Sequence, residues 1–62
     1  MSDRDLIIVN MRKVTGLSQA RFAELLDIPV ANIQKWEQGV SAPPDYVKRL
    51  IYRDLQHRGY PI

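Results

Sequence analysis

The sequence predicts an all-α fold, a compact bundle of four helices. Three breaks divide the 62 residues into four segments of helical length, and they lie at Thr15-Gly16, at residues 27–29 and at residues 39–44. Apolar residues recur at helical spacing within these segments. The apolar run over residues 6–9 is also compatible with a short buried strand, but a single strand would have no partner. We therefore expect helices throughout.

Length and composition limit the functions that this chain can have. Sixty-two residues form one domain, so we expect residues 1–62 to be a single unit. The absence of cysteine and the presence of one histidine leave no thiolate zinc site, no multi-histidine metal site and no cysteine nucleophile. No apolar run approaches the roughly 18 residues of a membrane span. We therefore expect a cytoplasmic binding domain without cofactors or metals, and not an enzyme.

The first helix is predicted over about residues 3–14. Ser2 and Asp5 have the spacing of a capping box at its start. Gly16 suits the left-handed backbone conformation that often ends a helix. The inner face is expected to carry Leu6, Ile7, Met11 and Val14, with Ile8 beside them.

The second helix is predicted to begin after Ser18. Serine is a favourable N-cap residue, and Leu17 before it can pack against Phe22 as a hydrophobic staple. The helix should end by Asp27, because Pro29 disfavours helical geometry at the residue before it. Its inner face is expected to carry Phe22, Ala23, Leu25 and Leu26.

The third helix is predicted over about residues 30–38 and should end at Gly39. Its buried residues are expected to be Ile33 and Trp36, which lie three positions apart. Together with the second helix it occupies about residues 18–38. The two residues between these helices are too few for an antiparallel pair, so we expect a steep crossing.

The fourth helix is predicted over about residues 44–58, because proline is well tolerated in the first helical turn. Gly59 should close it, and residues 60–62 then form a short exposed tail. The inner stripe is expected to comprise Tyr46, Val47, Leu50, Ile51, Asp54 and Leu55.

Residues 12–44 contain many characteristic residue types in a fixed order. They are Arg12, residues 15–19 (Thr-Gly-Leu-Ser-Gln), Phe22, Ala23, Leu26, Ile28, Ile33, residues 36–39 (Trp-Glu-Gln-Gly) and Pro43. This pattern resembles the helix-turn-helix of the phage repressor/Cro superfamily, often called Xre-like. The continuation through Tyr46, Leu50-Ile51-Tyr52 and Leu55 resembles small stand-alone bacterial regulators.

The resemblance implies a sequence-specific transcriptional regulator that binds double-stranded DNA. The helix over residues 30–38 would be the recognition helix and would enter the major groove. A homodimer would place two such helices on a near-palindromic site. The residues implied in DNA binding are Ser18, Gln19, Val30, Ala31, Asn32, Gln34 and Lys35.

The side chains of these residues allow different contacts. Gln19 lies at a helix start, where amide donors and the helix dipole favour phosphate, whereas Ser18 can be a cap alone. Lys35 can donate to guanine or remain a solvated lysine. Asn32 and Gln34 can bind adenine edges, bind phosphate or face solvent. In the same helix, the apolar Val30 and Ala31 can contact a thymine methyl group or pack on the turn.

Arg12 and Glu37 match an arginine and a glutamate of the family pattern. The resemblance implies that this pair joins the first helix to the end of the recognition helix. A bidentate pair would fix the angle of that helix. The alternative is two unrelated surface charges.

The sequence also departs from the family pattern. Residues 40–42 carry no lysine or arginine, where relatives commonly have phosphate-binding cations, so weaker and less salt-dependent binding is expected. Asp27 replaces the usual glycine of the turn. A second interpretation is therefore an antitoxin-like or accessory module that chiefly binds a protein partner such as a toxin. The apolar Val30, Ala31 and Val40 and the tail over residues 60–62 fit that interpretation.

Overall fold

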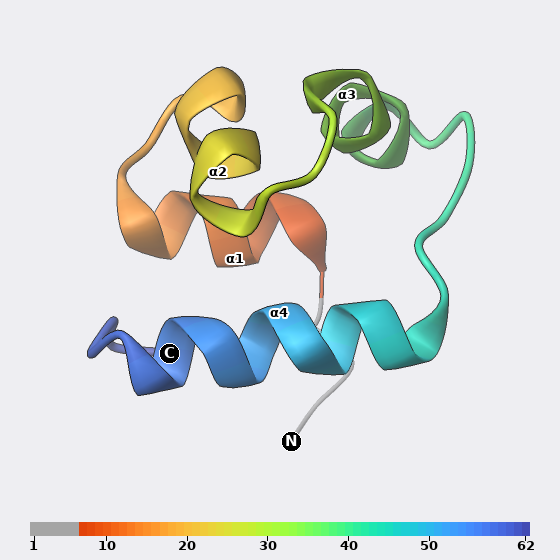
Figure 1. Ribbon diagram of the computed structural model, residues 1–62. Coiled ribbons are helices and arrows are strands. Elements are labelled where there is room, and N and C mark those ends of the chain that lie inside the picture. The colour runs from red at the N-terminus through yellow and green to blue at the C-terminus, as the bar shows by residue number, and fades with distance from the viewer. Residues whose placement is uncertain (1–6) are drawn as a thin grey trace.

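The computed structural model describes residues 7–62, and this part of the chain consists of four helices without strands. The helices are α1 (Ile8–Thr15), α2 (Gln19–Leu26), α3 (Val30–Gln38) and α4 (Asp45–His57). In Figure 1, α2 and α3 lie on one side of the molecule, and α1 and α4 lie next to each other on the other side. The predicted all-α class is therefore confirmed. Within residues 7–62 no helix combines the length and the apolar character needed to cross a membrane.

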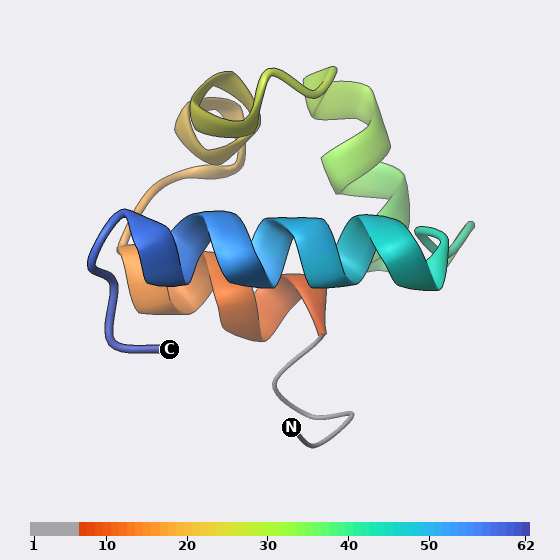
Figure 2. The same cartoon turned by 60° about the horizontal axis from the view of Figure 1, so that its bottom comes forward.

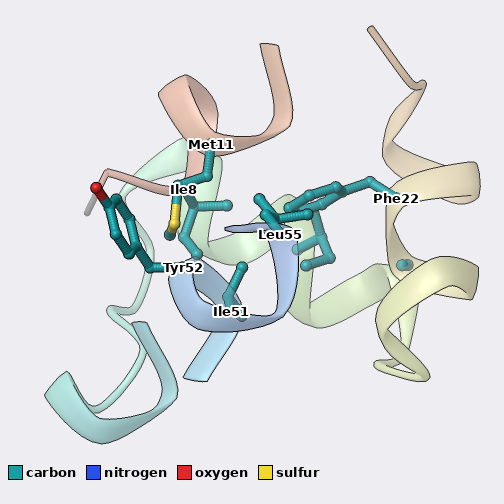
Figure 3. Close-up of a cluster of buried hydrophobic side chains, with 8 residues drawn as sticks. Ile8, Met11, Phe22, Ile51, Tyr52 and Leu55 are labelled. Carbon is teal, nitrogen blue, oxygen red and sulfur yellow. The ribbon is translucent and has the colours of Figure 1, made fainter. Parts of the chain in front are cut away.

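The core is built from side chains of all four helices. Met11, Phe22, Ile33 and Leu55 are fully buried, and each comes from a different helix. In Figure 3, Leu55 of α4 lies between Phe22 on one side and Ile8 with Met11 on the other. Because every helix inserts a side chain into the same centre, the orientation of each helix depends on the other three.

The first helix begins later than predicted. Ile7 is the N-cap residue in extended conformation and contributes no side-chain cap, so helix α1 starts at Ile8. The proposed capping box of Ser2 and Asp5 lies outside the described residues, as does Leu6. Ile7, expected in the core, is 49% exposed, whereas Ile8 is 4% exposed. Ile7 precedes the helix with an extended backbone, so its side chain does not share the helical face that places Ile8 in the core.

The connection between α2 and α3 is short and well defined. The Ser18 hydroxyl oxygen accepts a hydrogen bond from the Arg21 amide at 3.2 Å, which confirms the predicted N-cap. Asp27 ends α2 in the left-handed conformation with φ of 56°. The Ile28 amide then donates to the Ala23 carbonyl at 2.9 Å. These local bonds leave one further residue before α3 begins.

The inner face of α4 differs from the predicted stripe. Tyr46 and Leu50 are 66% and 57% exposed, whereas Ile51, Tyr52 and Leu55 are buried. The stripe prediction for Tyr46 and Leu50 was therefore wrong. The helix buries its middle and its C-terminal part, where α1 and the other helices cover it, and its first turns present apolar side chains to solvent.

The last residues pack back onto the bundle instead of forming an exposed tail. Gly59 has φ of 93°, and the Tyr60 amide donates to the Leu55 carbonyl at 3.1 Å. Tyr60 and Ile62 are partly buried against the core. Figure 2 shows the chain turning back beside α1 after the end of α4. The prediction of an exposed tail was wrong, because Gly59 adopts a left-handed conformation and redirects the chain toward the core.

Candidate nucleic-acid interface

Helix α3 has one buried face and one exposed face. Ile33 is fully buried and Trp36 is partly buried against the core. Five α3 residues are predicted from the sequence to contact DNA, and all five are exposed. They are Val30, Ala31, Asn32, Gln34 and Lys35. The structure therefore brings these five residues to one exposed surface, which we call the α3 outer face.

The α3 outer face also includes Gln38, which was not among the residues predicted to contact DNA. Gln38 is exposed in the last turn of α3. It lies four positions after Gln34 and three after Lys35, so it continues the same side of the helix. This helical spacing was the signal that could have identified it.

The start of α2 lies next to the end of α3. The Gln19 side-chain amide donates to a Glu37 carboxylate oxygen at 3.1 Å. An amide nitrogen carries two hydrogens, so the bond to Glu37 uses one donor and leaves a second for another acceptor. Ser18 is exposed, and its hydroxyl oxygen already accepts the capping bond. Of these two residues, Gln19 is thus the one whose side chain is bound by a residue of α3.

Arg12 and Glu37 form a bidentate ion pair between α1 and α3. The Arg12 Nε donates to Glu37 Oε2 at 2.7 Å, and a terminal guanidinium nitrogen donates to Oε1 at 3.0 Å. The other terminal nitrogen donates to the Leu17 carbonyl at 3.0 Å. The two side chains are 22% and 7% exposed. With the bond from Gln19, one carboxylate joins α1, the start of α2 and α3, and we call these residues the Glu37 network.

The protonation states in the Glu37 network follow from these bonds. The hydrogen bond from Arg12 lowers the pKa of Glu37, and this effect outweighs the opposing effect of burial. The hydrogen bond to Glu37 likewise raises the pKa of Arg12. Both groups are therefore charged at neutral pH, and the network fixes α3 by charge-assisted hydrogen bonds.

The charge of the surface around α3 is modest. Lys35 is the one basic residue of α3, and the exposed loop over residues 40–42 carries Val40, Ser41 and Ala42. Asp27 is exposed at the turn before α3. In the part of the chain from residue 7 onward, no cluster of three histidine or acidic side chains could hold a metal ion. The surface thus offers amide, ammonium and methyl groups rather than a strong positive field.

The comparisons with known proteins identify one family. A family model described as helix-turn-helix matches residues 10–51, which is more than half of the chain. The matched range covers most of α1, all of α2 and α3 and the first half of α4. No curated protein and no solved structure matches the chain.

Proposed function

The chain belongs to the Cro/Xre-type helix-turn-helix family of DNA-binding regulators, and we propose that it recognises a specific sequence in double-stranded DNA. In this proposal the four-helix unit acts as one DNA-binding domain and α3 is the recognition helix. The α3 outer face enters the major groove, and Gln19 with Ser18 binds backbone phosphate at the start of α2. The chemistry is binding alone, with no catalytic step.

The observation that carries the proposal is the division of α3 into two faces. Ile33 is fully buried while all five candidate readers on the α3 outer face are exposed. Lys35 can donate to O6 and N7 of guanine, and Gln34 can form a bidentate pair with adenine. The Glu37 network supports this role, because it holds the helix at a fixed angle to α1 and α2.

We further propose that two copies bind together. A single small module with few cations would bind one half-site weakly. In a two-fold arrangement, two α3 helices would lie about 34 Å apart in successive major grooves of a near-palindromic site. Binding should therefore depend on half-site spacing, and insertion of about half a helical turn between the half-sites should abolish the tight complex.

A selection from a random duplex pool followed by titration tests the proposal. Lys35→Ala removes the ammonium donor. It should weaken binding to the selected site by about 5- to 150-fold and relax the preference at one base pair. Arg53→Ala is the control, because it removes one positive charge from an exposed position on α4. Equal binding by wild type, Lys35→Ala and Gln34→Ala would refute the assigned base contacts.

A second function on the same fold is an accessory or antitoxin-like module that binds a protein partner. The observation that favours it is an apolar surface on α4, where Tyr46 and Leu50 are exposed. Leu50 lines a groove of about 470 Å³ together with Leu25 and Ile28. Leu50→Lys should then abolish co-purification of a partner from the native cell, while Lys35→Ala should leave it unchanged. A partner retained equally by both variants would count against this surface.

A further inference from the structure

The first turn of α3 presents two apolar side chains to solvent. Val30 is 39% exposed and Ala31 is also exposed. Among residues 7–62, the partly buried apolar side chains packed against the core include Ile28 but not Val30. Pro29, the N-cap residue of α3, makes no side-chain capping bond that would involve this turn. Helix capping therefore does not account for two apolar residues at this position, and more than a third of the Val30 side chain remains open to contact.

We propose that Val30 and Ala31 recognise the C5-methyl group of a pyrimidine in the major groove, an inference that rests on the proposed DNA-binding function. The N-terminal residues of a recognition helix are the ones that contact base edges. Among the groups that base pairs present in the major groove, the C5-methyl is the apolar one. Every other edge offers a donor or acceptor, which loses its hydrogen bond to water when valine covers it.

The same methyl group occurs on two bases. Thymine supplies it in unmodified DNA, and 5-methylcytosine supplies it where cytosine is methylated. The apolar pair selects the methyl group and does not distinguish the groups at the pyrimidine C4 position. Affinity for the site is then sensitive to cytosine methylation wherever a cytosine stands opposite Val30.

The position of the methyl within the half-site follows from the helix. Gln34 lies four residues after Val30 and Lys35 lies four residues after Ala31, so each pair is separated by about 6 Å along the axis. Base pairs are stacked about 3.4 Å apart. The methyl-bearing pyrimidine should therefore lie within about two base pairs of the base that Gln34 or Lys35 reads.

Replacement of each thymine in the selected site by deoxyuridine tests the inference, because this change removes only the methyl group. At one thymine position in each half-site, we expect the deoxyuridine duplex to bind about fourfold more weakly per half-site. This factor corresponds to the free energy of removing one methyl-sized group from water. At the same position, 5-methylcytosine should bind about fourfold more tightly than cytosine. The variant Val30→Ser/Ala31→Ser carries no methyl group at either position and should bind thymine and deoxyuridine sites equally. Val40→Ser is the matched control.

Val40 suits this control because it is 69% exposed and lies in the loop after α3. It should retain the fourfold preference for thymine. The exposure of Val30 and Ala31 means that the double variant should fold, which its thermal unfolding curve verifies. A selected half-site without thymine, a thymine-to-deoxyuridine ratio of one at every position, or an unchanged ratio in the double variant would overturn the inference. Failure to select any duplex would instead refute the proposed function itself.

Discussion

Removal of the Glu37 carboxylate should be the most destabilising change of a polar side chain in α3. The carboxylate accepts three hydrogen bonds, two from Arg12 at 2.7 and 3.0 Å and one from Gln19 at 3.1 Å. In Glu37→Ala the Arg12 guanidinium would keep the Leu17 carbonyl but lose its counter-charge. Loss of one partner of a buried ion pair costs about 3–5 kcal/mol. Because Arg12 is 22% exposed, we expect about 3 kcal/mol.

This loss is large for a small domain. At about 0.05–0.15 kcal/mol per residue, 62 residues have a total stability of about 3–9 kcal/mol. Urea and thermal unfolding followed by circular dichroism should therefore show a lower urea midpoint, with a Tm lower by about 12–24 °C. Glu37→Gln keeps an acceptor for Arg12 but places a second amide donor beside Gln19, so it should cost about 1–2 kcal/mol. This milder variant remains measurable if Glu37→Ala is unfolded at room temperature.

The control is an exposed glutamate in an ion pair of its own. Glu24 lies 3.5 Å from Arg21, and both side chains are 73% exposed. Glu24→Ala should therefore change stability by less than about 0.5 kcal/mol. If Glu37→Ala and Glu24→Ala have the same stability within error, the Glu37 network does not stabilise the fold and the reasoning is refuted.

Three further predictions concern stability. Because the pKa of Glu37 is lowered in the folded state, its stabilisation is complete above the ordinary pKa of a glutamate and is lost as the pH falls through the lower folded pKa. Tm measured from neutral to acidic pH should therefore fall less in Glu37→Gln than in wild type. Asp27→Gly should stabilise the protein by about 0.5 kcal/mol, because φ is 56° at this position; a lower urea midpoint would contradict the assigned backbone conformation. Phe22→Ala should cost about 3–5 kcal/mol, since the ring is fully buried, whereas Leu50→Ala should cost less than about 0.5 kcal/mol at a 57% exposed position; equal urea midpoints for these two variants would contradict the assigned core.

Features that depend on neighbouring residues were predictable from the sequence. The Ser18 cap, the end of α2 at Asp27 and the glycine that ends α1 are set by the chain within a few residues. Two choices of inner face were not predictable. Ile7 and Ile8 are equally apolar, and α4 carries tyrosines at positions 46 and 52. Which member of each pair is buried depends on the surface that the other helices present.

The candidate site was predictable in part for the same reason. The direction of the α3 outer face follows from the positions of Ile33 and Trp36 within a single helix. The bond between Gln19 and Glu37 joins residues 18 positions apart on two helices. Sequence reasoning assigned Gln19 to phosphate and Glu37 to Arg12, and the contact between them emerges only when α2 and α3 are placed together. The hydrogen bond also shows that the Gln19 side chain is oriented before any ligand arrives.

The two faces of α3 bear on how a protein of this kind can acquire a new target. Ile33 anchors the helix from inside, and the Glu37 network sets its angle from one end. Substitutions at exposed positions usually change stability by less than about 0.5 kcal/mol. Under the proposed function, successive substitutions on the α3 outer face can therefore shift the preferred DNA sequence while every intermediate stays folded. The same scaffold could accept a grafted set of reading residues without any repacking of its interior.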